Sequence, residues 1–547
     1  MRIRNVVTIA IVALLGGYVI GAAEGELPFS KDDIAAAEKL IGLEFTDAER
    51  DSMQGDLADY HEAYAAMRST DIPNSLPPAL VLHIASLPPQ DGAAPVWSKA
   101  KKVKRPENLE DVAFWPVRDL GELIRTKQVT SVELTTMYLD RLKKYGPTLE
   151  CVVSLTEERA LEAARRADAE IAKGKYRGPL HGIPYGAKDL LAVEGTKTTW
   201  GAMPYKDQVI DDTATVIRKL DEAGAVLVAK TTLGALAWGD VWFGGMTRNP
   251  WNTEKGSSGS SAGSASATAA GLVAFAIGTE TWGSIVSPST VCGDTGLRPT
   301  FGRVSRAGAM ALSWSMDKIG PICRSVEDCA IVFNTIRGAD GIDPAVQDGS
   351  FSYRPDAMLK DIRIGYVKSM FDEDYPNHER DAATLDKLRE LGARLEPIEL
   401  PAIDVSPLAC VLSAEAAAAF DELTRSNRDD LLVRQIRNAW PNTFRAARFI
   451  PAVEYIQANR IRTRVMQEME KLPVDVYLTP TFGGDNLLLT NLTGHPCVVL
   501  PNGFDEDGEP TSITFMGRLY ADATVLEVAK AYQDATGFHT QHPPKFR

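Results

Sequence analysis

The sequence predicts an α/β fold in which helices cover both faces of a central sheet. Short apolar segments such as Val152–Leu155 and Ala225–Ala229 have the length and composition of buried strands. Between them lies Glu157–Lys173, an alanine- and charge-rich segment that is typical of a helix and is closed by Gly174. Because such segments alternate from Pro116 onward, the pattern favours a sheet between two layers of helices.

Residues 1–25 have the pattern of an export signal. A basic start precedes Val6–Ala23, which carries no charge, and the small residues that end this run suit cleavage. The run is also close to the length of a membrane-spanning helix, so an anchor formed by residues 5–23 is the alternative. On either interpretation we expect the rest of the chain to be exported, to the periplasm or the extracellular space.

Residues 26–83 are predicted to form a helical extension before the main domain. Thr46-Asp47-Ala48-Glu49 is a capping box that opens a helix, and Leu76-Pro77-Pro78 stops the helical pattern. Residues 84–110 contain several prolines and a basic cluster, which is typical of a linker. The main domain is therefore expected to cover residues 111–547.

The main domain continues with further alternating elements. A capping box at Thr130–Glu133 begins a helix that Gly146 is expected to end, and Leu180–Ala187 is a strand-like segment that leads to Lys188. Residues 426–452 are variable in character and are expected to form a lid or a pocket wall. The other predicted helices are Asp212–Ala223, Ser325–Arg337, Asp381–Leu391, Leu412–Arg425, Val453–Leu472 and Thr524–Ala535, and the other predicted strands are Ile362–Val367, Val474–Leu478, Cys497–Leu500 and Thr511–Phe515.

Composition argues against several classes of protein. The net charge of −14 repels nucleic acid, so we expect no DNA or RNA partner. Six cysteines in 547 residues are too few for a disulfide scaffold, and buried thiols are favoured over a Cys323–Cys329 pair. The seven histidines include no H-E-x-x-H motif, so a zinc hydrolase is poorly supported and no metal site is predicted.

Two stretches rich in small residues flank an apolar run in the middle of the chain. They are Gly256–Ser264 and Gly278–Ile285, and the segment between them, Ala269–Ile277, is alanine-rich and then apolar. Glycines let a backbone approach a substrate closely, serines supply hydroxyl groups, and a tight turn supplies free N–H groups. This combination suits an enzyme that attacks a carbonyl with a serine and holds the oxyanion with backbone donors. A flexible linker is the alternative, but strand-like segments lie close on both sides.

The stretch from Gly256 to Ser305 resembles the signature segment of the amidase signature family. Upstream, Gly182–Asp189 resembles that family's lysine strand, and downstream Leu492–Pro496 and Phe515–Arg518 resemble its closing motifs. The resemblance covers roughly residues 110–545, with the motifs in the expected order and spacing. It implies the family's fold, a large mixed, mostly parallel central sheet covered by helices on both faces.

The resemblance also implies a role for each residue of the site. Ser284 is the expected nucleophile, Ser260 the proton relay that follows a cis peptide bond, and Lys188 the base. Burial beside hydroxyl groups lowers the pKa of a lysine, which must be neutral to accept a proton. No cofactor is implied. The remaining expected residues are the oxyanion donors, which are the backbone N–H groups of Thr281, Trp282, Gly283 and Ser284, and the supporting residues Ser261 and Glu280.

A rival assignment exists within the same stretch. Gly259-Ser260-Ser261-Ala262-Gly263 fits the G-x-S-x-G nucleophile elbow, which would make Ser261 the nucleophile. That motif requires a strand directly before it and a helix directly after it. Residues 249–255, which precede it, have the composition of a loop, so Ser284 is the preferred nucleophile.

The sequence departs from the family pattern at two positions. Trp282 and Val286 stand where many members have glycine and arginine. The tryptophan keeps its backbone N–H group, but its ring is expected to narrow the acyl pocket, and the missing arginine removes a charge near the nucleophile. This version of the motif is similar to the subgroup that contains peptide C-terminal amidases.

We therefore expect an exported amidase that hydrolyses a carboxamide of a small molecule or a peptide to a carboxylic acid and ammonia. The alternatives are the glutaminase component of a tRNA-dependent amidotransferase, a peptide C-terminal amidase, and a non-catalytic binding protein, against which the complete set of catalytic residues argues. Glu38–Thr46, with Tyr60 and Met67, resembles the small C subunit of those amidotransferases, which wraps the amidase component. On this resemblance the extension is expected to wrap around the enzyme domain.

Overall fold

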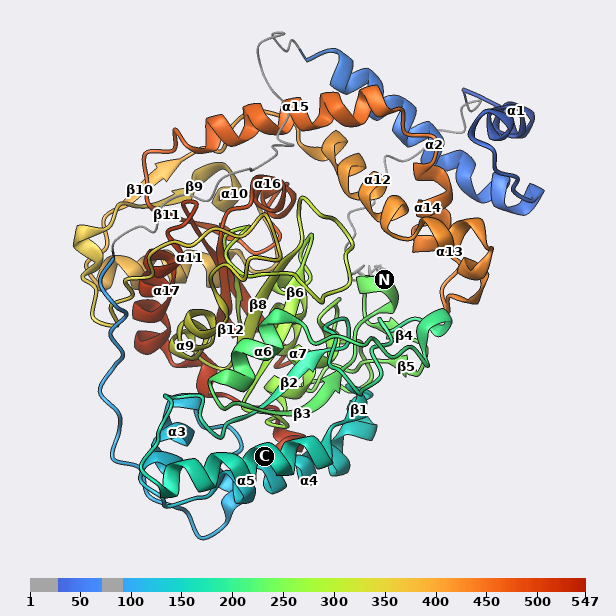
Figure 1. Cartoon of the computed structure of the whole chain (residues 1–547). Coiled ribbons are helices and arrows are strands. Elements are labelled where there is room, and N and C mark those ends of the chain that lie inside the picture. Colours follow the sequence, from blue (N-terminus) through green and yellow to red (C-terminus); the bar gives the residue numbers. More distant parts are fainter. Residues whose placement is uncertain (1–27, 71–91) are drawn as a thin grey trace, which may run out of the picture.

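An 11-stranded sheet forms the centre of the computed structural model, which describes residues 28–70 and 92–547 (Figure 1). A separate two-stranded hairpin consists of β4 (Val241–Trp242) and β5 (Gly245–Met246). In chain order, the strands of the large sheet are β1 (Val152–Leu155), β2 (Pro184–Lys188), β3 (Val226–Thr231), β6 (Phe275–Glu280), β7 (Thr295–Arg298), β8 (Lys318–Cys323), β9 (Ile364–Val367), β10 (Leu395–Ile398), β11 (Val476–Pro480), β12 (Cys497–Phe504) and β13 (Pro510–Gly517).

The sheet is mixed, as the sequence predicts. Its strands follow the order β1-β3-β2-β6-β8-β7-β12-β13-β11-β9-β10. Parallel pairing joins β3, β2 and β6 on one flank and β11, β9 and β10 on the other. The strands between these flanks pair antiparallel, and β1 is antiparallel to β3. The expected parallel pairing is therefore found in the flanks. In the centre, short connections such as the turn at 505–509 between β12 and β13 can join only antiparallel strands.

Helices surround the sheet and also form an outer arm beside it (Figure 1). In chain order, the α-helices of the described residues are α1 (Lys31–Ile41), α2 (Asp47–Arg68), α3 (Val117–Arg125), α4 (Ser131–Leu149), α5 (Glu157–Ala172), α6 (Thr215–Glu222), α7 (Ala262–Ala269), α8 (Val286–Cys292), α9 (Val326–Ile336), α10 (Lys368–Phe371), α11 (His378–Glu390), α12 (Cys410–Ala419), α13 (Asp421–Arg425), α14 (Trp440–Ala447), α15 (Ala452–Met469), α16 (Asn486–Thr493) and α17 (Asp522–Thr536).

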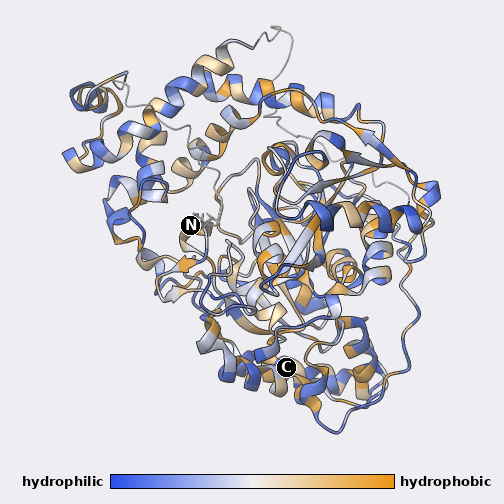
Figure 2. Cartoon of the chain, turned by 180° about the vertical axis from the view of Figure 1, so that it is seen from behind, coloured by the Kyte–Doolittle hydropathy of each residue, from blue (hydrophilic) through white to orange (hydrophobic). Residues whose placement is uncertain are grey.

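Both faces of the sheet are covered, as predicted. In β8, Ile322 belongs to an apolar cluster with Ala265 of α7 and Ile285 on one face. Its neighbour Cys323 belongs to the main core, together with Cys329 of α9. Because successive side chains of a strand point to opposite faces, α7 and α9 lie on opposite sides of the sheet. Figure 2 shows hydrophobic colouring along the central elements and alternating colours along the outer helices.

In the outer arm, the N-terminal helix α2 packs against α14 and α15, and α1 packs against α2 (Figure 1). Thr46 caps α2 as predicted, because its side chain accepts a hydrogen bond from the N–H group of Glu49. An apolar cluster joins the extension to α14 through Ile34, Phe45, Met53, Leu57 and Ala446. The helical extension is confirmed over these residues, and the expectation that it wraps around the enzyme domain stays a prediction.

Two predicted helix boundaries are wrong. Helix α4 does not end at Gly146 but runs to Leu149, where Glu150 adopts the left-handed C-cap conformation with φ of 48°. The expected helix Leu412–Arg425 is divided at Phe420, which has non-helical backbone angles, into α12 and α13. In both cases tertiary packing outweighs the local signal, since Phe420 is buried against the aromatic ring of Phe444.

The segments expected at the N-terminus lie partly beyond the structure. The predicted signal at residues 1–25 and the helix stop at Leu76-Pro77-Pro78 lie outside the described residues. No helix within residues 28–70 and 92–547 is long and apolar enough to span a membrane. All six cysteines are buried and free, so the prediction of buried thiols is confirmed.

Candidate active site

Lys188 ends β2 with its side chain completely buried. Its Nζ atom lies 2.8 Å from Ser260 Oγ, 2.8 Å from Thr279 Oγ1 and 3.0 Å from Ser261 Oγ. The structure thus brings together the lysine and two of the predicted serines, which are 72 and 73 positions away along the chain. Thr279, a partner of Lys188 that sequence reasoning missed, precedes the predicted Glu280 by one residue.

The surroundings of Lys188 favour its neutral form. Within the described residues no carboxylate forms an ion pair with its amine, which contacts hydroxyl groups and the Thr279 carbonyl oxygen. The next residue, Asp189, forms a buried ion pair with Lys230 instead, at 2.8 Å. Burial lowers the pKa of Lys188 well below its ordinary value, and the more distant charges of Asp317 and Glu280 oppose this effect only in part. A neutral lysine at this place can accept a proton.

The loop before α7 carries Ser260 and Ser261. The peptide bond between Gly259 and Ser260 is cis, as the family pattern implies. Gly259 has no alternative here, since a Cβ atom on it would lie 1.9 Å from the carbonyl oxygen of Gly239. Ser261 N–H donates a hydrogen bond of 3.1 Å to the carbonyl oxygen of Ser284, so the two serine loops lie side by side.

Ser284 lies in the turn between β6 and α8 and is half-buried. Within the described residues its hydroxyl group makes no hydrogen bond, and the backbone N–H groups of Trp282, Gly283 and Ser284 have no protein acceptor. Gly283 allows this turn because its φ is 90°, a conformation that favours glycine. A hydroxyl without a hydrogen-bond partner beside free N–H groups is the arrangement that a nucleophile and an oxyanion hole require.

Glu280 holds this turn from inside the protein. Its buried carboxylate accepts hydrogen bonds from the N–H groups of Ile285 and Val286, at 2.8 and 2.9 Å. On its other oxygen it pairs with Arg298 at 2.8 Å and accepts a hydrogen bond from Asn491 at 2.9 Å. Arg298 and Asn491 were missed in the sequence, although both lie within or next to motifs that carry the family resemblance. The side chain of Glu280 is completely buried, as a supporting residue inside the turn requires.

Thr281 and the two residues that depart from the family pattern, Trp282 and Val286, also lie in or next to this turn. Thr281 donates a hydrogen bond of 2.6 Å from its hydroxyl to Asp317, which fixes the start of the turn. The side chain of Trp282 is half-buried, and Val286, at the position where many members have arginine, is fully buried at the start of α8.

The nucleophile-elbow assignment for Ser261 finds only half of its required context. Helix α7 begins directly after Ser261, but the residues before Gly259 form a loop rather than a strand. Ser261 Oγ also donates a hydrogen bond to the carbonyl oxygen of Thr279 and accepts one from the Thr279 N–H group. A hydroxyl that is buried and saturated in this way cannot approach a substrate, whereas that of Ser284 is free.

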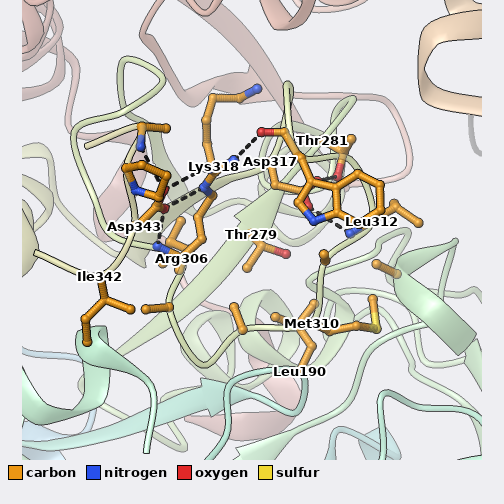
Figure 3. Close-up of a pocket in the computed structure, with 18 residues that line it drawn as sticks. Leu190, Thr279, Thr281, Arg306, Met310, Leu312, Asp317, Lys318, Ile342 and Asp343 are labelled. Carbon is orange, nitrogen blue, oxygen red and sulfur yellow. Dashed lines mark hydrogen bonds and ion pairs between the residues drawn. The ribbon is translucent and has the colours of Figure 1, made fainter. Parts of the chain in front are cut away.

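A cavity of about 470 Å³ adjoins the site (Figure 3). Thr279 and Thr281 line its inner end. Thr279 contacts Lys188, and Thr281 begins the turn that carries Ser284. The cavity therefore reaches a residue that contacts Lys188, although neither Lys188 nor Ser284 lines it.

Comparisons with known proteins identify the family of the chain. The family model described as Amidase matches residues 133–490. The A subunit of the glutamyl-tRNA(Gln) amidotransferase of Moorella thermoacetica is 33% identical over 489 residues, which are 79% of this chain and 99% of that protein. Its counterpart in Dechloromonas aromatica is 34% identical over 484 residues, 78% of this chain and 98% of the counterpart.

Solved structures show the same architecture. The native peptide amidase of Stenotrophomonas maltophilia superposes with a TM-score of 0.70 at 29% identity, and the match covers 78% of this chain and 98% of that one. Because the family model covers more than half of the chain and the similar amidotransferase proteins are matched almost end to end, the relationship extends through the whole main domain. The chain belongs to the amidase signature family, and it is an enzyme that hydrolyses amide C–N bonds.

Proposed function

We propose that the enzyme converts a carboxamide to a carboxylic acid and ammonia through a seryl acyl-enzyme, with Ser284 as nucleophile, Ser260 as proton relay and Lys188 as base. One observation carries this proposal. The buried amine of Lys188 lies 2.8 Å from Ser260 Oγ and forms no ion pair within the described residues. A neutral amine hydrogen-bonded to a hydroxyl is the start of a proton path, because it can take the proton that a serine must lose.

The first half of the reaction forms the acyl-enzyme. Ser284 Oγ attacks the amide carbon as its proton passes to Ser260, whose own proton passes to Lys188. The carbonyl oxygen becomes an oxyanion and accepts hydrogen bonds from the free N–H groups of the turn before α8. Lys188 then returns its proton through Ser260 to the amide nitrogen, the C–N bond breaks, and ammonia leaves.

The second half of the reaction releases the acid. A water molecule attacks the ester carbon of the acyl-enzyme as its proton passes to Ser260, whose own proton passes to Lys188. Ser284 Oγ leaves with the returned proton, and the carboxylic acid is free. Glu280 acts as a positioning residue in both halves, since it holds the N–H groups of Ile285 and Val286 and so fixes the turn that follows Ser284.

Labelling with a serine-reactive acylating probe tests the assignment. We expect intact-protein mass spectrometry to show one added acyl group, and peptide mapping to place it on Ser284. Ser284→Ala should abolish both labelling and ammonia release, whereas Ser261→Ala should weaken them without abolishing labelling. Loss of labelling in Ser261→Ala, with labelling retained in Ser284→Ala, would falsify the assignment in favour of the nucleophile elbow.

A second candidate function is the glutaminase reaction of an amidotransferase. The curated relatives named above are components of glutamyl-tRNA(Gln) amidotransferases, and their similarity extends over almost their whole length. On this candidate the ammonia comes from glutamine and the chain acts with partner proteins on glutamyl-tRNA. Glutamine-dependent amidation of glutamyl-tRNA by the purified chain with such partners supports it, whereas ammonia release from other amides alone supports a free-standing amidase.

Export is a proposal that rests on residues 1–25. The composition of that segment is its support, and the amidotransferase relatives offer none. We expect the protein isolated from its native cell to lack this segment, or to retain it in the membrane fraction. Edman sequencing and fractionation check this, and a full-length protein found only in the cytoplasmic fraction contradicts it.

A further inference from the structure

The cavity extends from the protein surface to Thr279, which contacts the proposed base. Two residues of its wall, Ile342 and Trp314, are 62% and 53% exposed, so the cavity is open to solvent there. At its inner end lie Thr279, whose hydroxyl contacts Lys188, and Thr281, at the start of the turn that carries Ser284. A substrate group that fills this cavity would therefore lie against Thr279 and Thr281, one residue contact away from Lys188 and three positions before Ser284 in the chain.

Apolar side chains make up most of the cavity wall. Figure 3 shows Leu190 and Met310 on one side of Thr279, with Leu312 and Ile342 at opposite ends. The apolar lining residues are Leu190, Ala237, Ala307, Ala309, Met310, Ala311, Leu312, Trp314, Ile319, Ile342, Pro344 and Ala345. Such a wall stabilises an apolar group through burial and dispersion contacts.

The basic residue of the wall nearest the surface, Arg306, is already paired. Its guanidinium group forms two parallel hydrogen bonds with the Asp343 carboxylate, at 2.8 and 2.9 Å, and the Asp343 carboxylate also accepts the Arg306 N–H group at 2.9 Å. A further guanidinium nitrogen donates to the carbonyl oxygen of Trp314 (Figure 3). Three of the five guanidinium N–H donors are thus used within the protein, and the Asp343 carboxylate already balances the charge of Arg306.

The remaining charged residues of the wall are also occupied. Asp317 accepts hydrogen bonds from the Thr281 hydroxyl and from the N–H groups of Leu312 and Ser313, at 2.6 to 2.9 Å. Lys318 is buried, and its amine donates to the carbonyl oxygen of Met316. Among the described residues that line the cavity, each charged side chain thus has a partner in the protein.

We propose that this cavity binds the acyl side chain of the substrate and selects an uncharged, apolar one, such as an arylalkyl or branched alkyl group. The proposal rests on the proposed function and adds the substrate class to it. The α-ammonium and α-carboxylate groups of glutamine would lose their water in the cavity and find no free counter-charge on its wall, which makes their burial unfavourable. The cavity therefore favours an apolar carboxamide over glutamine.

Ammonia release from a small set of primary amides tests this inference on the full-length protein. The probes are 3-phenylpropanamide, propanamide and L-glutamine. We expect kcat/KM for 3-phenylpropanamide to exceed the values for both other amides by at least about tenfold, because a hydrophobic pocket gains at least this factor from several buried carbon atoms.

A variant that fills the cavity separates binding there from general effects. Ala309 is partly exposed and lines the wall, so Ala309→Phe reduces the cavity without opening a void. We expect the preference for 3-phenylpropanamide over propanamide to fall by at least about tenfold in this variant. Ala531→Phe is the matched control, since Ala531 is also partly buried but lies in α17 and does not line the cavity. Its preference should stay at the wild-type ratio.

The outcomes distinguish this inference from the proposed function. Glutamine turnover equal to or faster than that of 3-phenylpropanamide overturns the substrate class and leaves the acyl-enzyme mechanism standing. An unchanged preference in Ala309→Phe shows that the acyl group binds elsewhere and also overturns the inference. If no amide releases ammonia and Ser284 is not labelled by an acylating probe, the proposed function itself fails, and the inference fails with it.

Discussion

At the end of β2, two consecutive residues have opposite electrostatic surroundings. Asp189 pairs with the buried amine of Lys230, whereas Lys188 contacts hydroxyl groups and a carbonyl oxygen. Neighbouring residues of a strand point to opposite sides, so a carboxylate can follow the lysine in sequence without reaching its amine. This local arrangement allows burial to dominate the pKa of Lys188, so the neutral form of the proposed base is populated at lower pH than that of an ordinary lysine.

The pH dependence of acylation follows from this lowered pKa. Because burial holds the pKa of Lys188 well below about 10.4, the ordinary value, the neutral form is populated at lower pH and grows as pH rises. We expect kcat/KM to rise with pH through the folded-state pKa and to level off well below pH ~10.4. Stopped-flow acylation between pH 5 and 10 measures this, and a rising limb centred on the ordinary lysine pKa would contradict the role of Lys188.

Glu280 and Arg298 form a fully buried ion pair, and each carries further hydrogen bonds. In Glu280→Gln the guanidinium group of Arg298 is left in the interior without a counter-charge. We expect the free energy of unfolding to fall by about 3–5 kcal/mol and kcat to fall with it. Urea denaturation and steady-state kinetics measure the two effects.

A double variant serves as the control for this prediction. Glu280→Gln combined with Arg298→Met removes both charges and should recover part of the lost stability, because no unpaired charge remains. Activity should stay low, since the turn before α8 still lacks its anionic acceptor. A single variant as stable as the wild type would mean that the ion pair contributes nothing to the fold.

At the scale of elements, the helical extension is attached to the outer arm by two arginines with different surroundings. Arg445 of α14 is 6% exposed and contacts Glu49 of α2 at 2.8 Å and Asp429 at 2.7 Å. Arg437 is 56% exposed and contacts Asp56 and Asp59 of α2, at 2.8 and 2.6 Å. Burial raises the pKa of Asp429 to about 6, which shows how strongly this carboxylate depends on Arg445 to stay ionised.

The two arginines should therefore differ in their contributions to stability. Arg445→Met leaves Asp429 buried without its counter-charge and is expected to cost about 3–5 kcal/mol. In Arg437→Met the lost arginine is mostly exposed, and the carboxylate of Asp56 keeps its hydrogen bond from Asn442, so the expected cost is less than about 1 kcal/mol. Urea denaturation of both variants measures the difference. Equal losses would show that the depth of burial does not determine the strength of this contact.

At the scale of the whole molecule, the extension and the main domain share apolar core. Met53 of α2 is fully buried, and Tyr64 and Met67 of the same helix belong to the main core. Each large apolar side chain that loses such burial costs about 1.5–3 kcal/mol. The extension therefore behaves as a structural part of the enzyme rather than as a separate appendage.

Truncation tests this view. A chain that begins at residue 92 loses α1 and α2 and exposes the apolar surfaces of α14 and α15 that they cover. We expect a lower Tm and more light scattering than for a chain that begins at residue 28, which keeps both helices. Differential scanning fluorimetry and light scattering compare the two, and identical melting curves would show that the extension adds no stability.

The sequence by itself determined the local pattern of this fold. The strand Val152–Leu155 and the capping box at Thr46 were predicted at their observed places because strand length and capping depend on neighbouring residues. The motif spacing also indicated Lys188, Ser260 and Ser284 through the family resemblance. By contrast, β7 and β10 were not predicted, because polar residues interrupt the apolar pattern of both strands and β10 also contains Pro397.

Only the tertiary structure decided how distant residues meet at the site. It placed Thr279 against Lys188, and it gave Glu280 its partners Arg298 and Asn491, the latter 211 positions away. It also formed a cavity whose wall comes from several separate segments, and the charged residues of that wall are paired within the protein. These features depend on the packing of strands that are far apart along the chain, and no local propensity or spacing encodes such distances.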